Sequence, residues 1–200
     1  MKRKTVADEF IKIARGPFAP VYPVIAEQIF KKTGFKEGKL VDAGCGPGGL
    51  GISYAKISNM DITLLDISKK MLNYAMEDVN RNNLADRVKT INSDVHSIPL
   101  DTETINLVIS RGSMFFWENR VECFKEIYRI LISGGIAYIG GGFGSNELKE
   151  RINKTNGFKT EKFIGPGKEK IYENELITAE IKNYEIIRDD TGMWIIFRKV

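Results

Sequence analysis

The stretch Val41-Asp42-Ala43-Gly44-Cys45-Gly46-Pro47-Gly48-Gly49 follows a short apolar run and precedes a helical pattern. Residues 39–42 are expected to form a buried strand, and residues 50–57 to form a helix. Glycines at such a junction let the backbone approach a ligand where a Cβ atom would collide. The spacing of Gly44, Gly46 and Gly49 satisfies the nucleotide-binding pattern GxGxxG, with a tight turn that binds no ligand as the alternative.

Strands and helices alternate on both sides of this stretch. Ser68 is the expected N-cap of a helix that reaches about Asn82, and Ser133-Gly134-Gly135 are expected to end a helix over 120–132. Such alternation requires right-handed crossovers and a parallel sheet covered on both faces. The fold class is therefore α/β, a doubly wound and mostly parallel sheet of seven strands with a C-terminal antiparallel hairpin. Its strands are expected at 39–42, 61–66, 88–92, 105–110, 136–139, 184–188 and 193–198.

The whole chain, residues 1–200, is expected to form one domain in three parts. Residues 1–36 carry two helical apolar stripes and form an N-terminal helical lid, and residues 37–144 form the ligand-binding core. Residues 145–200 supply a C-terminal helix and the hairpin. Residues 157–175 show no firm periodicity and are expected to form a loop. The two stripes are Val6, Phe10, Ile13, Ala14 and then Val21, Val24, Ile25, Ile29.

Composition narrows the class of protein. The 200 residues carry a net charge of +4, with basic and acidic residues mixed along the chain, so neither a nucleic acid nor a membrane is the expected partner. No apolar stretch is long enough to span a bilayer, and the first residues lack a signal-peptide core, which predicts a cytoplasmic protein. Cys45 and Cys123 are expected to be reduced thiols, and no metal site is expected.

Two acidic residues stand where further strands end. Asp66 closes the strand over 61–66, where a carboxylate can accept hydrogen bonds from the ribose hydroxyls of an adenosine. The alternative for Asp66 is a helix-starting aspartate beside Ser68. Asp94 follows the strand over 88–92 and can accept from an adenine amino group, while the amide of Val95 can donate to a ring nitrogen. These positions favour an adenosine-containing ligand.

Four motifs in order now resemble the class I (Rossmann-like) S-adenosylmethionine-dependent methyltransferases, within their small-molecule branch. They are Val41 to Gly48, Leu65-Asp66-Ile67-Ser68, Ser93-Asp94-Val95 to Ile98-Pro99, and Ile130 to Gly135, where Ile132 and Ser133 replace the usual lysine and proline. The resemblance covers about Leu40 to Gly142. It implies that S-adenosylmethionine binds and leaves as S-adenosylhomocysteine. The implied cofactor-binding residues are Asp42, Gly44, Cys45, Gly46, Gly48, Asp66, Ile67, Met71, Asp94, Val95, His96 and Arg111.

In the family's pattern, Asp42 and the glycine loop hold the amino-acid part of the donor, Asp66 the ribose, and Asp94 with Val95 the adenine. Methyl transfer from a sulfonium is an in-line displacement that alignment and desolvation accelerate, so no catalytic base is assigned. The candidates for a catalytic role are Tyr22 and Arg111. His96 could act as a base, but its expected place beside adenine is remote from the methyl group.

The candidate acceptor side has alternatives for each residue. Arg111 could hold an acidic group of the substrate or pair with a carboxylate of the fold. Phe115, Phe116 and Trp117 could wall an apolar cavity or surround the sulfonium by cation–π contact. The alternative is that Phe115 and Trp117 pack beneath the next helix. Tyr22 could lie near the methyl group in a lid, or the segment could be a plain helix docked on the sheet.

The predicted function is methyl transfer from S-adenosylmethionine to an unidentified small molecule. A non-catalytic accessory protein that binds the same donor is the first alternative. An NAD-dependent oxidoreductase is the second, because GxGxxG alone also fits a dinucleotide. The sequence leaves the oligomeric state open.

Overall fold

The computed structural model describes residues 6–156 and 167–200 and contains one seven-stranded sheet. The strand order is β3-β2-β1-β4-β5-β7-β6. Strands β1 to β5 run parallel, whereas β7 is antiparallel to both β5 and β6. The predicted fold class is confirmed. The strands are β1 (Lys39–Ala43), β2 (Asp61–Asp66), β3 (Val88–Asn92), β4 (Ile105–Arg111), β5 (Leu131–Gly142), β6 (Tyr184–Asp189) and β7 (Gly192–Arg198).

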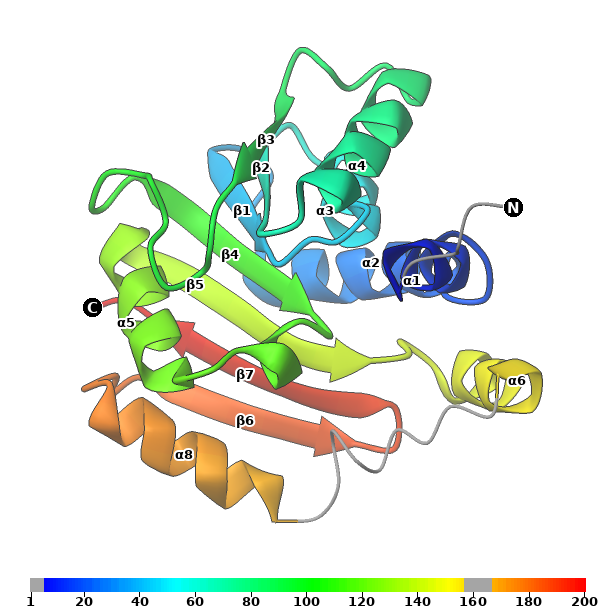
Figure 1. Ribbon diagram of the computed structural model, residues 1–200. Coiled ribbons are helices and arrows are strands. Elements are labelled where there is room, and N and C mark those ends of the chain that lie inside the picture. The colour runs from blue at the N-terminus through cyan, green and yellow to red at the C-terminus, as the bar shows by residue number, and fades with distance from the viewer. Residues whose placement is uncertain (1–5, 157–166) are drawn as a thin grey trace.

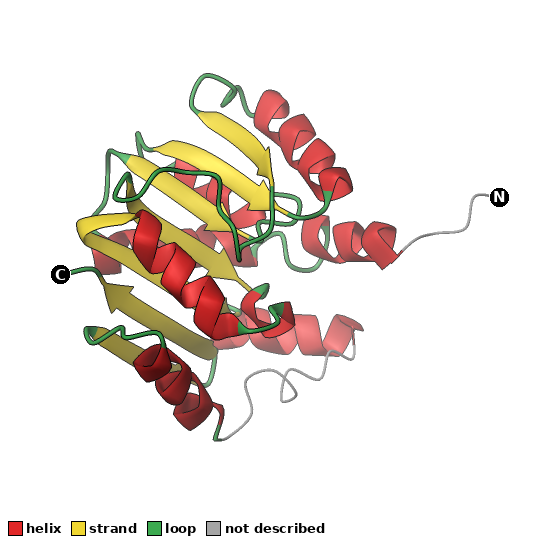
Figure 2. Cartoon of the chain, turned by 60° about the vertical axis from the view of Figure 1, so that its left-hand side comes forward, coloured by secondary structure: helices red, strands yellow, loops and turns green. Residues whose placement is uncertain are grey.

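Helices cover both faces of the sheet (Figure 2). Helices α2 (Val21–Thr33), α3 (Gly49–Ala55), α4 (Lys69–Arg81) and α6 (Asn146–Asn156) bury side chains in one core layer. Helices α5 (Arg120–Ile130) and α8 (Lys168–Thr178) pack in the layer on the other face. The short 3-10 helix η1 (Met114–Phe116) follows β4, and α1 (Val6–Arg15) lies on the side toward which β4 and β5 point (Figure 1).

The strand order reverses between β1 and β4, and this switch point positions the glycine loop. Parallel pairing places Asp42 opposite Leu64 on β2 and Ile109 on β4. The loop is fastened to β2, because the amides of Gly44 and Cys45 both donate to the carbonyl of Leu65, at 2.8 and 2.9 Å. In open α/β sheets, ligands bind beyond the carboxyl ends of the strands at such a reversal.

Three predicted boundaries were wrong. Helix α5 ends at Ile130 rather than at residue 132, because Leu131 already has extended backbone and pairs with Ile105. The residues expected to end the helix lie within β5, where a register shift separates Ile105 from Leu107 and the amide of Gly134 donates to the carbonyl of Lys199. Helix α3 covers Gly49–Ala55 rather than 50–57.

The expected loop over 157–175 was also partly wrong. Its second half contains the start of α8, whose Tyr172 and Leu176 are buried against α5 and the sheet. Residues 157–166 of that expectation lie outside the described part of the chain. The hairpin and the N-cap are confirmed, since β6 and β7 pair antiparallel and the Ser68 side chain accepts from the amide of Met71.

Candidate active site

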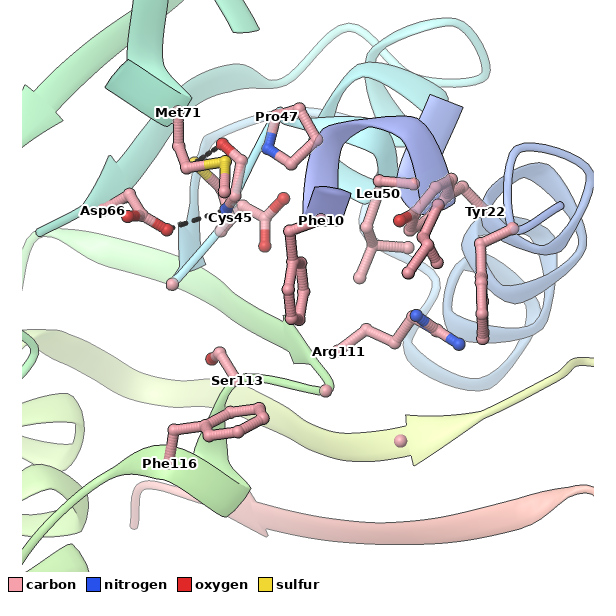
Figure 3. A pocket seen from close by; sticks show the side chains of 18 of the residues that line it. Phe10, Tyr22, Cys45, Pro47, Leu50, Asp66, Met71, Arg111, Ser113 and Phe116 are labelled. Carbon is pink, nitrogen blue, oxygen red and sulfur yellow. Dashed lines mark hydrogen bonds between the residues drawn. The ribbon is translucent and has the colours of Figure 1, made fainter. Parts of the chain in front are cut away.

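A cavity of about 510 Å³ opens at the carboxyl ends of β1, β2, β4 and β5. In Figure 3, Asp66, Cys45 and Met71 stand at one end, Arg111 and Tyr22 stand at the other, and Phe10 lies between them. Its volume falls in the usual range for sites that bind small molecules. The lining residues are Phe10, Ile13, Ala14, Phe18, Tyr22, Asp42, Gly44, Cys45, Gly46, Pro47, Leu50, Asp66, Ser68, Met71, Arg111, Gly112, Ser113, Phe115, Phe116, Gly141, Gly142 and Phe143.

The glycine loop forms a floor of backbone without side chains. Gly44 has φ +68°, and a Cβ atom there would come within 2.4 Å of the Ser113 hydroxyl, which donates to the carbonyl of Ala43 at 3.0 Å. Gly46 has φ +54°, and a Cβ atom there would meet no atom within 4 Å. Since Gly46 lines the cavity, this space is open for a ligand. The loop is therefore a cradle that a side chain would fill.

Asp42 is a buried carboxylate at the end of β1. Its side chain lines the cavity although the residue is only 1% exposed, and Oδ2 accepts from the backbone amide of Gly51 at 2.8 Å. Burial raises the pKa of Asp42 to about 7, while the bond from Gly51 opposes the rise and the charge of Asp66 adds to it. Its Oδ1 has no hydrogen-bond donor among the described residues. A ligand ammonium group is the partner that such an oxygen can accept from.

Asp66 ties the glycine loop to the start of α4. Oδ2 accepts from the amide of Gly46 and Oδ1 from the amide of Ser68, both at 2.8 Å. Partial burial raises the pKa of Asp66, although both amide bonds oppose the rise. Each carboxylate oxygen can accept more than one hydrogen bond, so Asp66 retains capacity for ligand hydroxyls on the cavity side.

Cys45 lies in the same loop and is a free thiol. Burial, followed by the charges of Asp42 and Asp66, raises its pKa well above the usual value. The thiol therefore stays neutral, and its Sγ donates to the carbonyl of Gly46 at 3.3 Å. The environment favours a packing role over a nucleophilic one.

Arg111 ends β4 at the opposite end of the cavity. Its Nε and Nη2 donate to the carbonyl of Gly142 at 3.0 and 2.9 Å. The guanidinium carbon lies 4.6 Å from the ring centroid of Phe18 and 5.5 Å from that of Tyr22. Burial raises the pKa of Tyr22 and lowers that of Arg111, while each group opposes the shift of the other. Tyr22 thus packs beside Arg111 in the wall of the cavity.

The sequence matches a family model described as "Methyltransferase domain" over residues 41–139. A chain from Methanococcus maripaludis, assigned to the S-adenosyl-L-methionine-dependent methyltransferases, has a solved structure with a TM-score of 0.93 and 40% identity; the match covers 100% of this chain and 97% of that one. The protein belongs to the class I S-adenosyl-L-methionine-dependent methyltransferases. The resemblance stated from the motifs is confirmed.

Two curated methyltransferases each match about half of the chain. The 2-methyl-6-phytyl-1,4-hydroquinone methyltransferase 1 of Oryza sativa subsp. japonica is 34% identical over 52% of this chain and 30% of its own length. The malonyl-[acyl-carrier protein] O-methyltransferase of Enterobacter lignolyticus is 32% identical over 49% of this chain and 36% of its own. The chain thus aligns with about a third of these relatives. Family membership removes the nicotinamide alternative for the glycine loop.

The methyltransferase cavity gathers seven of the twelve residues predicted to bind the donor. These are Asp42, Gly44, Cys45, Gly46, Asp66, Met71 and Arg111. The other five, which are Gly48, Ile67, Asp94, Val95 and His96, do not line it. Gly48 faces Leu64 and Ala75, and Val95 is buried in the core. Ile67 is 71% exposed.

Asp94 and His96 are engaged with each other. Asp94 Oδ1 accepts from the His96 amide at 2.9 Å and contacts His96 Nδ1 at 2.5 Å, while His96 Nε2 contacts the carbonyl of Glu118 at 2.5 Å. These bonds link the residues after β3 to the segment between η1 and α5. They also lower the pKa of Asp94 and raise that of His96.

The aromatic residues after β4 divide between the two expected roles. Phe115 and Phe116 line the cavity, whereas Trp117 does not and packs, partly buried, against the core layer that contains α5. Sequence reasoning missed Phe10 as a cavity residue, because its helical spacing suggested burial. Phe10 is 47% exposed, and its ring meets Phe116 edge to face with centroids 6.5 Å apart. The buried face of α1 carries Ile11 and Ala14 instead.

Within the described chain, no helix is long and apolar enough to cross a bilayer. Residues 6–156 and 167–200 also bring together no set of three histidine, cysteine, aspartate or glutamate side chains that could hold a metal ion.

Proposed function

We propose that this chain binds S-adenosylmethionine in the cavity and transfers its methyl group to a small molecule bound at the aromatic end. The observation that carries the proposal is that one continuous cavity joins the glycine cradle and two carboxylates to a wall of aromatic side chains. The first part suits the donor, and the second suits an organic acceptor. The proposal treats residues 1–200 as one domain, in which the segment 1–36 contributes α1 as the cover of the site and 37–144 bind the donor.

The donor-binding roles follow the resemblance and fit the side chains present. Asp42 offers its unpaired oxygen to the ammonium group, and Gly44, Cys45 and Gly46 accommodate the amino-acid part. Gly48 acts through the loop itself, because its missing side chain lets the loop pack against Leu64 and Ala75. Asp66, with Ile67 and Met71 beside it, serves the ribose. We assign Asp94, Val95 and His96 to the adenine side, where His96 holds the Asp94 carboxylate.

The donor supplies a methyl carbon on a sulfonium, so the acceptor's lone pair forms the new bond as the carbon–sulfur bond breaks and its electrons remain on sulfur. The chain's own residues align the two reactants and remove water from around them. Phe10, Phe115 and Phe116 enclose the space beyond the glycine loop, and removal of water from that space strengthens electrostatic contacts inside it. Tyr22 and Arg111 are the polar groups at the acceptor end and are our candidates for orienting the nucleophile.

A free small molecule is the partner we propose, with neither a nucleic acid nor a membrane, in the cytoplasm. The free state of Cys45 and Cys123 agrees with a reducing compartment. The relatives named above are methyltransferases of 2-methyl-6-phytyl-1,4-hydroquinone and of malonyl-[acyl-carrier protein]. Because these acceptors differ so much from each other, the acceptor of this chain has to be found by experiment.

Calorimetric titration with S-adenosylmethionine, S-adenosylhomocysteine and NAD tests the donor. We expect both sulfur compounds to bind at one site per chain and NAD not to bind. Incubation with donor labelled in the methyl group and a metabolite extract then tests transfer. Donor binding without transfer to any small molecule would favour the non-catalytic accessory role, and absence of donor binding would refute both.

A further inference from the structure

Arg111 is a cavity-lining cation without a protein anion. Its guanidinium uses two N–H groups on the carbonyl of Gly142, and the neighbouring Tyr22 hydroxyl can accept another. A guanidinium carries five N–H donors, so further donors remain. Among residues 6–156 and 167–200, no carboxylate pairs with Arg111. Of the two alternatives for Arg111, pairing with a carboxylate of the fold is therefore not the one that the described residues show.

The surroundings of Arg111 make this charge costly unless a ligand pairs with it. The side chain lies against the rings of Phe18 and Tyr22, and burial lowers its pKa without depriving it of its proton at neutral pH. Among the described lining residues, Arg111 is the single lysine or arginine. An unpaired charge in an apolar site is expensive, and such groups concentrate where a ligand supplies the partner.

The placement of Arg111 separates it from Asp66, the carboxylate proposed to serve the ribose. Asp66 and Met71 stand at the far end of the cavity, with Phe10 between them and Arg111 (Figure 3). The wall next to Arg111 is formed by Gly141, Gly142 and Phe143 at the end of β5. A Cβ atom at Gly141 would come within 2.7 Å of the Phe115 ring, so bare backbone at that position lets the ring pack there.

We propose that Arg111 binds an anionic group of the methyl acceptor, and that the acceptor is a small, largely apolar or aromatic molecule bearing a carboxylate or a phosphate. The planar guanidinium matches either oxyanion with paired hydrogen bonds. The rings of Phe18, Phe115, Phe116 and Phe143 line the adjoining space for the apolar part. This inference rests on the proposed function, because it assigns the acceptor to the same cavity.

Benzoate and benzamide are a matched pair of probes, since they share a ring and differ in charge. Calorimetric titrations are run on the wild type saturated with S-adenosylhomocysteine, so that the donor's own carboxylate already occupies its place. We expect benzoate to bind at least tenfold more tightly than benzamide. Arg111→Gln should abolish this preference, and Arg111→Lys should retain part of it, because lysine keeps the charge but not the fork of donors.

Arg198→Gln is the matched control. Arg198 also donates to a glycine carbonyl, that of Gly134 at 2.8 Å, but it is exposed and lies outside the cavity. This variant should keep the full benzoate preference. Melting temperatures of all variants identify any loss of folding, and the comparison of the two probes on the wild type stands even if Arg111→Gln does not fold.

Two results would overturn the inference. One is equal binding of benzoate and benzamide to the wild type. The other is a combined result in which S-adenosylhomocysteine displaces benzoate and Arg111→Gln weakens the binding of S-adenosylhomocysteine at least tenfold. In that case the binding of 5′-methylthioadenosine, which lacks the amino-acid part, would be unchanged. Arg111 would then bind the donor's carboxylate. If the wild type binds no S-adenosylhomocysteine, the proposed function fails. The comparison of benzoate with benzamide on the ligand-free protein still tests whether Arg111 binds an anion.

Discussion

The carboxylate of Asp42 accepts a hydrogen bond from the backbone amide of Gly51 at 2.8 Å, and this bond fixes the end of β1 to the first turn of α3. Burial raises the pKa of Asp42 from 3.8 to about 7. The folded state therefore holds a proton more tightly than the unfolded state does. The contribution of Asp42 to the stability of the fold is therefore greatest below pH 3.8 and is lost as the pH rises toward 7.

Asp42→Asn should consequently stabilise the fold at pH 8. The amide can still accept from Gly51 but carries no charge, and each unit of pKa shift corresponds to about 1.4 kcal/mol. We expect the free energy of unfolding in urea to rise by about 1–4 kcal/mol at pH 8, and the gain to vanish near pH 4. Asp61→Asn, at the exposed start of β2, is the control and should change the free energy of unfolding at pH 8 by no more than about 0.5 kcal/mol. An equal effect at both pH values would contradict the prediction.

Donor binding should depend on the same proton. If Asp42 accepts from the donor's ammonium, binding requires the ionised carboxylate, so affinity for S-adenosylhomocysteine should fall up to tenfold per pH unit below about 7. Asp42→Asn should bind about 1–3 kcal/mol more weakly at pH 8 and lose the pH dependence. Titration calorimetry from pH 5.5 to 8 measures both. A wild-type affinity that does not change over this range would remove Asp42 from the ammonium site.

A pair of glycines separates backbone strain from occupation of the cavity. Gly46 and Gly34 both have positive φ, +54° and +74°, and a Cβ atom at either would touch nothing within 4 Å. Replacement of either glycine by alanine should lower the free energy of unfolding by about 1–2 kcal/mol. Only Gly46 lines the cavity, so Gly46→Ala should weaken S-adenosylhomocysteine at least tenfold, whereas Gly34→Ala should leave binding unchanged. Equal loss in both variants would mean that strain alone is responsible.

The sequence predicted the sheet well because most of its strands, such as β1 and β2, are short apolar runs that end at an acid or just before a glycine. It predicted α8 poorly, because that helix buries Tyr172 and Leu176 while the equally apolar Ile171 and Ile177 face outward. No stripe distinguishes such a helix from a loop. The end of α5 was missed for a different reason: Leu131 continues an apolar spacing that also suits a strand, and its pairing with Ile105 decides the matter.

The site was predictable where residues act through the backbone or from strand ends, as at Gly44, Asp42 and Asp66. Phe10 shows the limit, because helical periodicity cannot distinguish a ring that enters the core from one that faces a cavity. The engagement of Asp94 by His96 was also not foreseen. It depends on where the carbonyl of Glu118 lies, 22 residues further along the chain.

His96 should hold its second ring proton more tightly than a free imidazole does. Its two ring nitrogens face the Asp94 carboxylate and the Glu118 carbonyl, both of which only accept hydrogen bonds. A neutral imidazole could satisfy one of them, and an imidazolium satisfies both. The bond from Asp94 raises the pKa of His96 above 6.5 in the folded state. The contacts of His96 with Asp94 and Glu118, here called the His96 clamp, therefore contribute stability below pH 6.5 that is lost as the pH rises through the pKa of the folded state.

The chain has one histidine, so its ring-proton resonance in an NMR titration needs no assignment. We expect a pKa above 6.5 in the wild type and a lower value in Asp94→Asn. Glu118→Gln is the control, because only its backbone carbonyl contacts the ring, and it should change the pKa less. A wild-type pKa at or below 6.5 would show that the clamp does not hold the proton.

Arg15 should control how firmly α1 covers the cavity. At the end of α1, its Nε donates to Asp78 at 2.9 Å and its Nη2 donates to the carbonyl of Tyr74 at 2.8 Å, both on α4. Because α1 contributes Phe10, Ile13 and Ala14 to the wall, loss of this tether should open the site without unfolding the core.

Arg15→Ala should cost about 1 kcal/mol or less of global stability. Hydrogen exchange of residues 6–15 should accelerate, and S-adenosylhomocysteine should dissociate faster. Lys125→Ala, which breaks the exposed pair with Glu122 on α5, should change neither rate. Unaltered exchange in α1 would mean that the Asp8–Lys70 ion pair and the packing of Ile11 and Ala14, not the arginine, hold the helix in place.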